Sequence, residues 1–325
     1  MMAGKHATEL DRQTVLARVI AVLNDKGGVG KTSVVANVGG QLAEAGYRIL
    51  IIDLNRQANL SDDLGVRGSS VDDQGQGLLD AIMMQGRIPL PVATGVRPNL
   101  DLVCGGTRLA ELTTWLVVKA THTGRDPQDD PNLALANVLV SVAEHYDVIF
   151  IDCPPENVAL GDLALGAARW VIMPTRTDLG GLIGMELVAE RFERAQQINP
   201  ALGLLGAVLF GTGTTATAIH KEASDAIAKA FGGTSPLFTA KIRHAERTGV
   251  DARRWGKLAH ELEAEAAAQP AWWEALRAGG DRTAPRISKT AASVAADYRE
   301  LAIEVLTVLR DAETSPSRTA DREAV

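Results

Sequence analysis

The feature of this sequence that most restricts its fold is a series of short, almost continuously apolar segments separated by helix-like segments. Strands that are covered by helices on both faces need such apolar runs. The runs occupy residues 18–24, 48–53, 99–104, 147–152, 170–174, 204–210 and 237–242. Helical spacing is found between them, at 32–46, 131–145 and 183–198. Because alternating strands and helices require crossover connections, we predict an α/β fold with a doubly wound, mostly parallel sheet and helices on both faces.

The chain is long enough for one sizeable core, since it has 325 residues and a hydrophobic content of 46%. We expect one domain over residues 18–313, preceded by a short N-terminal extension over residues 1–17. The polar segments 61–77 and 121–132 are interpreted as loops because they are rich in turn-forming residues.

The C-terminal part departs from this alternation. Residues 260–292 contain an Ala/Glu-rich run and the pair Trp272-Trp273, and we interpret them as a helical insertion. The two tryptophans would either pack back on the sheet as a small hydrophobic core or form a surface for a partner. The polar tail, residues 314–325, is expected to be disordered. Before it, a final helix is predicted with an apolar face made of Tyr298, Leu301, Ala302, Val305 and Leu309.

Charge and cysteine content disfavour several classes of protein. A net charge of −7 gives no general affinity for nucleic acid, so any DNA contact must come from a local patch. The two cysteines, Cys104 and Cys153, form no CxxC pair, which fits a reducing cytoplasm and argues against structural zinc or an iron–sulfur cluster. Because the N-terminus lacks an apolar leader and no apolar run could cross a bilayer, we expect a soluble, cytoplasmic protein.

Residues 24–33, with the sequence NDKGGVGKTS, contain a glycine-rich loop between a predicted strand and a predicted helix. Backbone N–H groups in such a loop point at phosphate oxygens, and the helix dipole there favours negative charge. Lys31 would contact the β- and γ-phosphates, and the Thr32 hydroxyl would bind Mg²⁺. The alternative is a strand–helix turn that binds no ligand. We expect the phosphate cradle to comprise Gly27, Gly28, Val29, Gly30, Lys31, Thr32 and Ser33.

Two aspartates are predicted to complete this site. Asp53 ends one apolar run and Asp152 ends another, and the carboxyl ends of parallel strands form the edge where open α/β folds bind ligands. A phosphate-bound Mg²⁺ keeps several water molecules, which carboxylates at this edge can hold. The alternative is that each aspartate only caps the turn after its strand.

Three segments resemble the deviant Walker A, switch and Walker B segments of the ParA/Soj partition ATPases, a family in the wider group that includes MinD. They are KGGVGKTS, ILIIDLNRQANLSDDLG and YDVIFIDCPPENVALGDLAL. The segments NLDLVCGGTRLAEL and VAADYRELAIEVL also fit, so the resemblance extends over residues 18–257 and 293–309. It implies ATP with Mg²⁺ and a homodimer in which two ATP molecules lie between the subunits. It also implies that Lys26 reaches the partner's nucleotide, the alternative being a solvated surface lysine.

The switch segment departs from the family pattern. Relatives have Asp-x-Asp-Pro-Gln where this chain has Asp53-Leu54-Asn55-Arg56-Gln57. In the family the second aspartate orients the attacking water, whereas the amide of Asn55 carries no negative charge and is not a base. The segments 211–214 and 242–244 also differ from stretches that help to hold the base in relatives. The resemblance implies ATP hydrolysis, and the departure at Asn55 implies that this hydrolysis is slow. The catalytic roles that the resemblance implies fall on Lys26, Lys31, Asp53, Asn55 and Asp152.

A local basic patch lies between residues 241 and 257, where Glu246 and Asp251 oppose six basic residues and leave a local charge of +4. Phosphate contacts through Lys and Arg, without base readout, are what nonspecific DNA binding needs. The alternative is a solvated loop whose arginines pair with carboxylates. Arg191 and Arg194 are weaker candidates because neighbouring glutamates offset them. We predict DNA contacts from Lys241, Arg243, Arg247, Arg253, Arg254 and Lys257.

The resemblance implies a partition ATPase that dimerises with ATP, binds nonspecific double-stranded DNA of the nucleoid and segregates plasmid or chromosomal DNA with a ParB-like partner. Asn55 keeps open a hydrolysis-poor scaffold that stays locked in its ATP state. A MinD-like positioning ATPase would need a basic amphipathic C-terminal helix, whereas this chain ends in DAETSPSRTADREAV, so we expect no membrane partner. An iron–sulfur reductase is disfavoured because Cys104 has no ligand-like context and the DCPP form around Cys153 is common in partition ATPases.

Overall fold

The computed structural model of the chain describes residues 9–122, 130–176, 188, 190–213, 217–230, 236–269, 277 and 287–314. In these residues one eight-stranded sheet has the order β3-β4-β2-β5-β1-β6-β7-β8. All neighbouring strands pair in parallel except β3 and β4, which are antiparallel. The predicted α/β fold with a mostly parallel sheet is therefore confirmed. The strands are β1 (Val19–Val22), β2 (Ile49–Asp53), β3 (Ala93–Arg97), β4 (Leu100–Val103), β5 (Val148–Asp152), β6 (Trp170–Thr175), β7 (Gly203–Thr212) and β8 (Leu237–Arg243).

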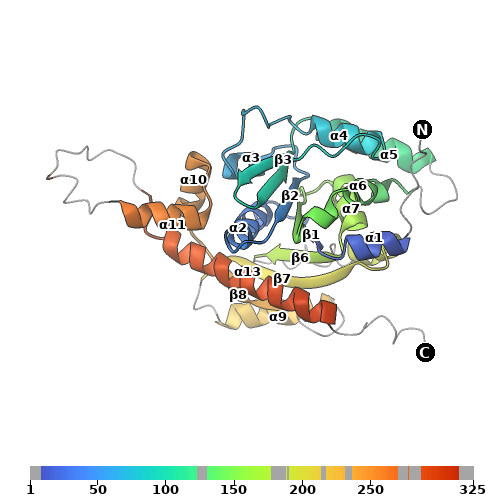
Figure 1. The fold of residues 1–325 in the computed structure, drawn as a ribbon. Coiled ribbons are helices and arrows are strands. Elements are labelled where there is room, and N and C mark those ends of the chain that lie inside the picture. The colour runs from blue at the N-terminus through green and yellow to red at the C-terminus, as the bar shows by residue number, and fades with distance from the viewer. Residues whose placement is uncertain are drawn as a thin grey trace.

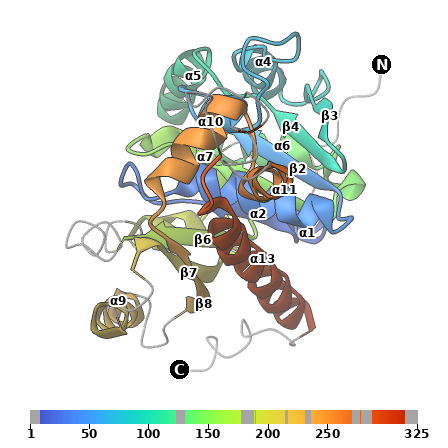
Figure 2. The same ribbon diagram turned by 90° about the vertical axis from the view of Figure 1, so that its left-hand side faces the viewer.

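Helices cover both faces of the sheet, and each face has its own buried apolar core (Figure 1). One face carries α2 (Lys31–Glu44), α3 (Asn59–Asp63), α11 (Ala259–Ala268) and α13 (Ala291–Thr314). The other carries α1 (Glu9–Val15), α4 (Gln76–Met83), α5 (Leu109–His122), α6 (Ala134–Leu139) and α7 (Val158–Ala167). Figure 2 shows α10 (Glu246–Trp255) next to α11, and α9 (Thr217–Ala230) at the β8 end of the sheet.

The central strands explain where the site forms. Every residue of β2 and of β5 is buried, because helices lie on both sides of these two apolar segments. In the parallel pairing of β2 with β5, Asp53 and Asp152 are direct register partners. The register therefore brings two buried carboxylates together at the carboxyl edge of the sheet.

Some predicted elements differ in the structure. The segment 131–145 is not one helix but two 3₁₀ turns, Pro131–Leu133 and Ala143–His145, flanking α6. The expected loop 61–77 contains the end of α3 and the start of α4. The edge strand β3 was not predicted, because its sequence ATGVR is short and only partly buried.

The C-terminal helix α13 matches the prediction, since all the residues of its predicted apolar face are buried. Its Glu304 carboxylate accepts hydrogen bonds from the backbone N–H groups of Thr239 and Ala240 in the edge strand β8, at 2.8 and 2.9 Å. These bonds satisfy donors that an edge strand would otherwise expose. Helix α11 forms the start of the expected insertion, whereas Trp272, Trp273 and the tail 315–325 lie outside the described residues.

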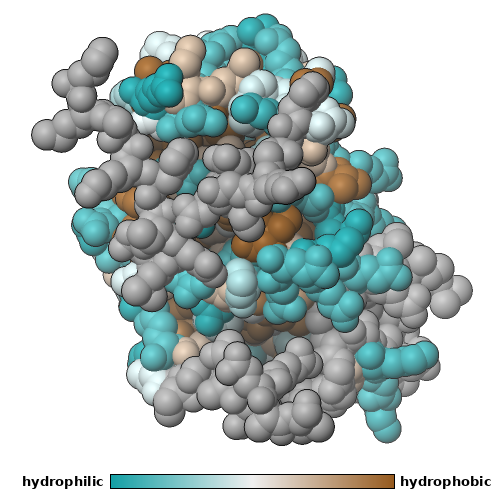
Figure 3. Space-filling view, turned by 90° about the vertical axis from the view of Figure 1, so that its right-hand side faces the viewer, coloured by the Kyte–Doolittle hydropathy of each residue, from teal (hydrophilic) through white to brown (hydrophobic). Residues whose placement is uncertain are grey.

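The surface is mainly hydrophilic where Figure 3 shows it, with small hydrophobic areas between polar ones. In the described part of the chain, no helix has both the length and the apolar character that crossing a membrane requires. Residues 9–15 of the expected N-terminal extension form α1, which adjoins the domain core at Leu16.

Candidate nucleotide-binding site

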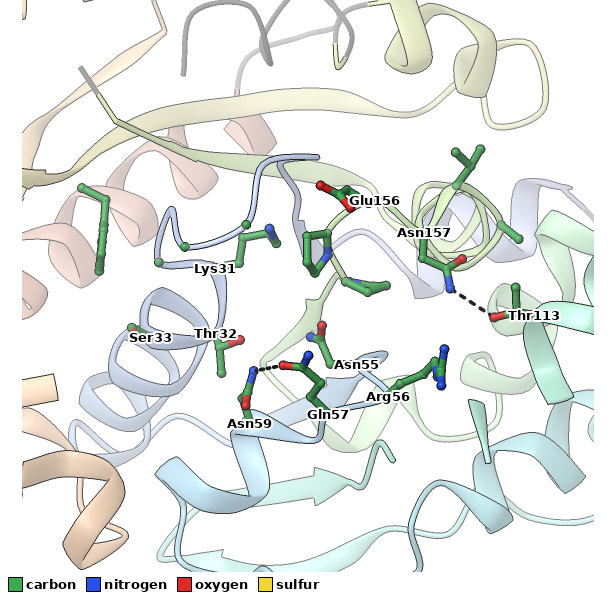
Figure 4. Close-up of a pocket in the computed structure, with 18 of the residues that line it drawn as sticks. Lys31, Thr32, Ser33, Asn55, Arg56, Gln57, Asn59, Thr113, Glu156 and Asn157 are labelled. Carbon is green, nitrogen blue, oxygen red and sulfur yellow. Dashed lines mark hydrogen bonds between the residues drawn. The ribbon is translucent and has the colours of Figure 1, made fainter. Parts of the chain in front are cut away.

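A large open cavity lies at the carboxyl edge of the sheet. Its volume is about 1090 Å³, which is enough for a nucleotide. The walls come from the glycine-rich loop, from the segment after β2 and from the segment after β5, with Thr113 and Val117 added by α5. In Figure 4, Lys31, Thr32 and Asn55 point into the cavity from the first two of these segments. The predicted cradle and the predicted switch segment therefore line one site.

The glycine-rich loop has the backbone that a phosphate cradle needs. Gly30 caps the N-terminus of α2 with φ of 90° and ψ of 17°, a left-handed conformation that favours glycine. A Cβ at this position would lie 2.3 Å from the ring of Phe210, so the aromatic ring also requires glycine here. The loop and the first turn of α2 thus present backbone N–H groups to the cavity with one aromatic side chain packed against them.

Lys31 is buried beside this loop, with 6% of its surface exposed. Its ammonium group donates hydrogen bonds to the carbonyl oxygens of Asn24 at 2.7 Å and of Lys26 at 2.9 Å. Burial lowers the pKa of Lys31, while the charge of Asp152 acts in the opposite direction. In this structure Lys31 therefore stabilises the start of the loop.

The two strand-end aspartates form a buried polar cluster with Thr32 and Asn55. Asp152 Oδ2 accepts hydrogen bonds from the Thr32 hydroxyl at 2.7 Å and from the Asn55 side-chain amide at 2.9 Å. Asp53 Oδ1 accepts one from the Asn55 backbone N–H at 2.8 Å. Burial, together with the charge of Asp152, raises the pKa of Asp53 well above its usual range. Burial also raises the pKa of Asp152 to about 7, although Thr32 and Lys31 lower it.

This cluster fits a magnesium ion. Asp53 Oδ2 and Asp152 Oδ1 are buried and have no hydrogen-bond partner among the described residues. An unsatisfied buried carboxylate oxygen is costly, and a hydrated cation beside it would supply donors and positive charge. In the same residues no group of three or more His, Cys, Asp or Glu side chains could hold a metal by itself. An ion here would therefore need phosphate or water ligands in addition to Thr32.

Lys26 lies half-buried at the start of the loop. Its backbone N–H donates to the side-chain oxygen of Asn24 at 2.9 Å, and the Asn24 amide donates to the carbonyl oxygen of Pro174 in β6 at 2.8 Å. The backbone from residue 24 to residue 26 is thus attached to the end of β6. The role of Asn24 was not predicted. A polar side chain that is fully buried directly after a strand needs hydrogen-bond partners, and this requirement could have indicated its contacts with the loop and with β6.

A second cavity, of about 440 Å³, adjoins the first. Ser33, Phe210 and Arg253 line both cavities. The second cavity also contains Gly211 and residues 242–244, the segments in which this sequence departs from the family pattern. It is also lined by Tyr298, whose pKa is raised by burial. Phe210 was not predicted as a site residue, because its contact with the loop joins distant parts of the chain.

The predicted DNA patch is less positive than its sequence suggests. Lys241 is half-buried, whereas Arg254 is exposed and makes no ion pair within the described residues. Arg191 is 3% exposed and bonded to two carboxylates, so the weak DNA role considered for it is wrong, while Arg194 is exposed. The four remaining cations of the patch form ion pairs: Arg243 with Asp297, Arg247 with Asp251, Arg253 with Asp63 and Lys257 with Glu265.

Neither cysteine has the character of a metal-ligating or reactive thiolate. Cys104 and Cys153 are both buried and unbonded to each other. Burial raises the pKa of the Cys104 thiol to about 11 and raises that of Cys153 further. Burial thus favours the protonated form of both thiols at neutral pH.

The chain is similar in sequence to a known family and to characterised relatives. The profile of a family described as "AAA domain" matches residues 17–204. The chromosome-partitioning ATPase Soj of Treponema pallidum is 28% identical over 77% of this chain and 98% of its own length. The chromosome partitioning protein ParA of Myxococcus xanthus is 30% identical over 63% of this chain and 69% of its own.

A solved structure has the same fold. Cobyrinic acid a,c-diamide synthase from Mycobacterium smegmatis, with bound ATP analogue and magnesium, superposes with a TM-score of 0.63 at 24% identity. The superposition covers 93% of this chain and 99% of that one. With the P-loop, the paired strand-end aspartates and these relatives together, the chain belongs to the ParA/Soj family of P-loop partition ATPases.

Proposed function

We propose that the chain is an ATP-driven dimeric switch that binds nonspecific DNA and segregates it with a ParB-like partner. The observation that carries the nucleotide chemistry is the pair of buried, unsatisfied oxygens, Asp53 Oδ2 and Asp152 Oδ1, next to the hydroxyl of Thr32. These groups suit a site for phosphate-bound Mg²⁺, because carboxylates beside such an ion hold its water molecules. The bound ATP analogue and magnesium in the cobyrinic acid synthase structure, which has the same fold, support this assignment.

In this proposal the nucleotide phosphates lie over the glycine-rich loop. Thr32 binds Mg²⁺ through its hydroxyl, and Asp53 and Asp152 bind it through water. Lys31 turns from the carbonyl oxygens of Asn24 and Lys26 to the β- and γ-phosphates. Magnesium, when bound, neutralises negative charge on the phosphates.

The base of the nucleotide would enter the second cavity. The Phe210 ring lies where the two cavities meet, and it packs against Gly30 in the loop. An aromatic ring at this position offers a stacking surface for a base while the phosphates remain over the loop. Stacking alone tolerates every base, so it does not itself select adenine.

A second copy of the chain would cover the open side of the first cavity. Val117 and Val158 line this cavity and are each 56% exposed, which leaves apolar side chains at its rim. Lys26 lies at the same loop, and its family role is to contact the nucleotide of the partner subunit. We therefore assign the open side to an ATP-dependent homodimer.

Asn55 would make hydrolysis slow. Its amide is bonded to Asp152 and supplies no negative charge for the attacking water. A slow rate favours a long-lived ATP-bound dimer, and in the limit of no hydrolysis the chain would act as an ATP-locked scaffold. The same geometry thus supports both the switch and the scaffold, which differ only in rate.

Nonspecific DNA binding would place the protein on the nucleoid in the cytoplasm. Arg254 is the best candidate for a phosphate contact, since it is exposed and outside the ion pairs of the patch. Arg253 is a poorer test residue, because it pairs with Asp63 at 3.5 Å and lines the nucleotide cavity. The other arginines of the patch would reach phosphate only in competition with their carboxylates.

The test is binding to duplex DNA of unrelated sequences, measured by fluorescence anisotropy with a nonhydrolysable ATP analogue and with MgADP. We expect binding only in the ATP state, with little sequence preference and an affinity that falls steeply as salt increases. Arg254→Glu should weaken binding, whereas the control Arg310→Glu, at an exposed position near the C-terminal end of α13, should not. Equal DNA affinity with ADP, or an unchanged affinity in Arg254→Glu, would contradict this part of the proposal.

A further inference from the structure

Arg191 is buried between two carboxylates, one from the glycine-rich loop and one from helix α7. It lies in the helical segment 190–196, and only 3% of its side chain is exposed. Its guanidinium donates to Asp25 Oδ1 at 2.7 Å and to Asp162 Oδ1 at 2.6 Å, and it also donates to the carbonyl oxygen of Val158. Asp25 precedes Lys26 in the glycine-rich loop, whereas Val158 and Asp162 belong to α7. One side chain therefore links the loop to the helix that follows β5.

Helix α7 is shaped for this guanidinium. Gly161 lies beside Asp162, and a Cβ on Gly161 would be 2.1 Å from Arg191 Nη2. Asn157, the residue directly before α7, is the N-cap of this helix. Its side-chain oxygen accepts a hydrogen bond from the Leu160 N–H at 3.1 Å. The start of α7 is thus fixed, so Arg191 holds Asp25 against a rigid element.

Besides Asn24, which accepts from the backbone N–H of Lys26, Lys31 also holds this part of the loop, but only while it donates to the carbonyl oxygen of Lys26. In the proposed function, Lys31 turns to the phosphates when nucleotide binds, and the carbonyl of Lys26 loses that donor. The ion pair between Arg191 and Asp25 does not involve the nucleotide and would persist. The anchor supplied by Arg191 therefore matters most in the nucleotide-bound state.

We propose that Arg191 is a positioning residue that holds Asp25, and with it the backbone of Lys26, in place for Lys26 to reach a second subunit. This inference rests on the proposed function for the role of Lys26. It assigns no contact between Arg191 and the nucleotide. A lysine cannot replace Arg191, because one ammonium group cannot bridge two carboxylates in the fixed fork of a guanidinium.

The test is hydrogen–deuterium exchange of the full chain over residues 24–30, with and without MgADP. Arg191→Lys and Asp25→Asn should each increase exchange there, and the increase should be larger with MgADP bound. Exchange rates should rise by about tenfold, as for a segment that loses a specific anchor. The matched control is Arg194→Lys, the same substitution three residues later at an exposed position. Unchanged exchange in both Asp25→Asn and Arg191→Lys would overturn the proposal.

Two further measurements separate positioning from simple destabilisation. MgADP affinity should stay within about threefold of wild type, since the cradle and Lys31 remain, while dimerisation with an ATP analogue should weaken by about tenfold. Asp25→Asn should add little to Arg191→Lys, because both remove the same contact.

If nucleotide affinity and dimerisation fall in parallel, the role of Arg191 is structural and the proposal fails. If wild type itself does not dimerise, the dimeric switch fails instead, and the exchange data still decide whether Arg191 anchors the loop. Asp25→Asn keeps the test available if Arg191→Lys does not fold, because Asp25 is partly exposed.

Discussion

The side-chain amide of Asn55 donates a hydrogen bond to Asp152 Oδ2 over 2.9 Å, and the Thr32 hydroxyl donates to the same oxygen over 2.7 Å. The switch residue is therefore bonded to the buried carboxylate that would hold the metal's water. An aspartate at position 55 could not donate this hydrogen bond. It would also place a third carboxylate beside Asp53 and Asp152. The amide thus stabilises the carboxylate pair when no cation is bound.

We expect Asn55→Asp to destabilise the metal-free protein. The lost donor and the added negative charge should cost about 1–3 kcal/mol, and the melting temperature in EDTA should fall by several degrees. Magnesium nucleotide should restore most of this loss, because the cation offsets the added charge. The matched control is Gln57→Glu, the same amide-to-carboxylate change at an exposed position in the same loop. Equal melting temperatures of Asn55→Asp and wild type in EDTA would show that the amide has no such role.

The same variant should hydrolyse ATP faster than wild type. A carboxylate is a stronger acceptor for the attacking water, so Asn55→Asp should raise the rate of single-turnover hydrolysis with and without DNA. Wild-type turnover should lie orders of magnitude below the median enzyme rate of about 10 per second. An unchanged or lower rate in Asn55→Asp would mean that another group positions the water.

The parts of the site that could be predicted from the sequence are local. Lys31 and Thr32 follow directly from the glycine-rich loop, and Asp53 and Asp152 each end an apolar run whose burial sets the strand register. The contact of Arg191 with Asp25 joins residues separated by 166 positions in the chain, so no spacing rule predicts it.

Surface charge also depends on contacts between distant segments. Residues 241–257 alone carry a charge of +4, but Asp297 and Asp63, from distant segments, pair with two of the arginines in this patch. Phe210 likewise reaches the loop at Gly30 only through the packing of the sheet edge. Long-range packing therefore decided which predicted side chains remain exposed.

Phe210→Ala should weaken ATP binding more than it weakens binding of inorganic tripolyphosphate. Base–aromatic stacking contributes about 1–3 kcal/mol, which corresponds to a loss of about 5-fold to 150-fold in ATP affinity. Tripolyphosphate has no base, so a loss of its affinity would show that removing the Phe210 ring has damaged the phosphate-binding loop. Isothermal titration of both ligands in wild type, Phe210→Ala and Phe210→Tyr measures this difference. If both ligands lose affinity equally in Phe210→Ala, the ring supports the loop and does not contact a base.

Asp63 should make stability depend on pH. Burial raises the pKa of Asp63 to about 6, although the Arg253 guanidinium lowers it. The unfolded value is about 3.9, so between these values the folded protein holds a proton that the unfolded chain releases. The free energy of unfolding therefore falls as pH rises from 4 to 6, by up to about 3 kcal/mol. The loss of stability that ionising the buried Asp63 causes is complete above pH 6 and absent below pH 4.

The Asp63→Asn variant lacks this titration. Its free energy of unfolding relative to wild type should therefore increase with pH between 4 and 6 and then become constant, as measured by urea unfolding at a series of pH values. Asp62→Asn, which removes the neighbouring half-buried carboxylate that pairs with Arg67, is the comparison variant. A difference between Asp63→Asn and wild type that is independent of pH would exclude a raised pKa at Asp63.

The central claim is that Lys31 binds the nucleotide of its own subunit while Lys26 contacts that of its partner. Sedimentation velocity with magnesium and a nonhydrolysable ATP analogue tests this claim directly, together with nucleotide binding by the same proteins. We predict that wild type dimerises, that Lys31→Ala neither binds nucleotide nor dimerises, and that Lys26→Ala binds nucleotide but remains a monomer. A Lys26→Ala protein that dimerises as wild type does would contradict the account.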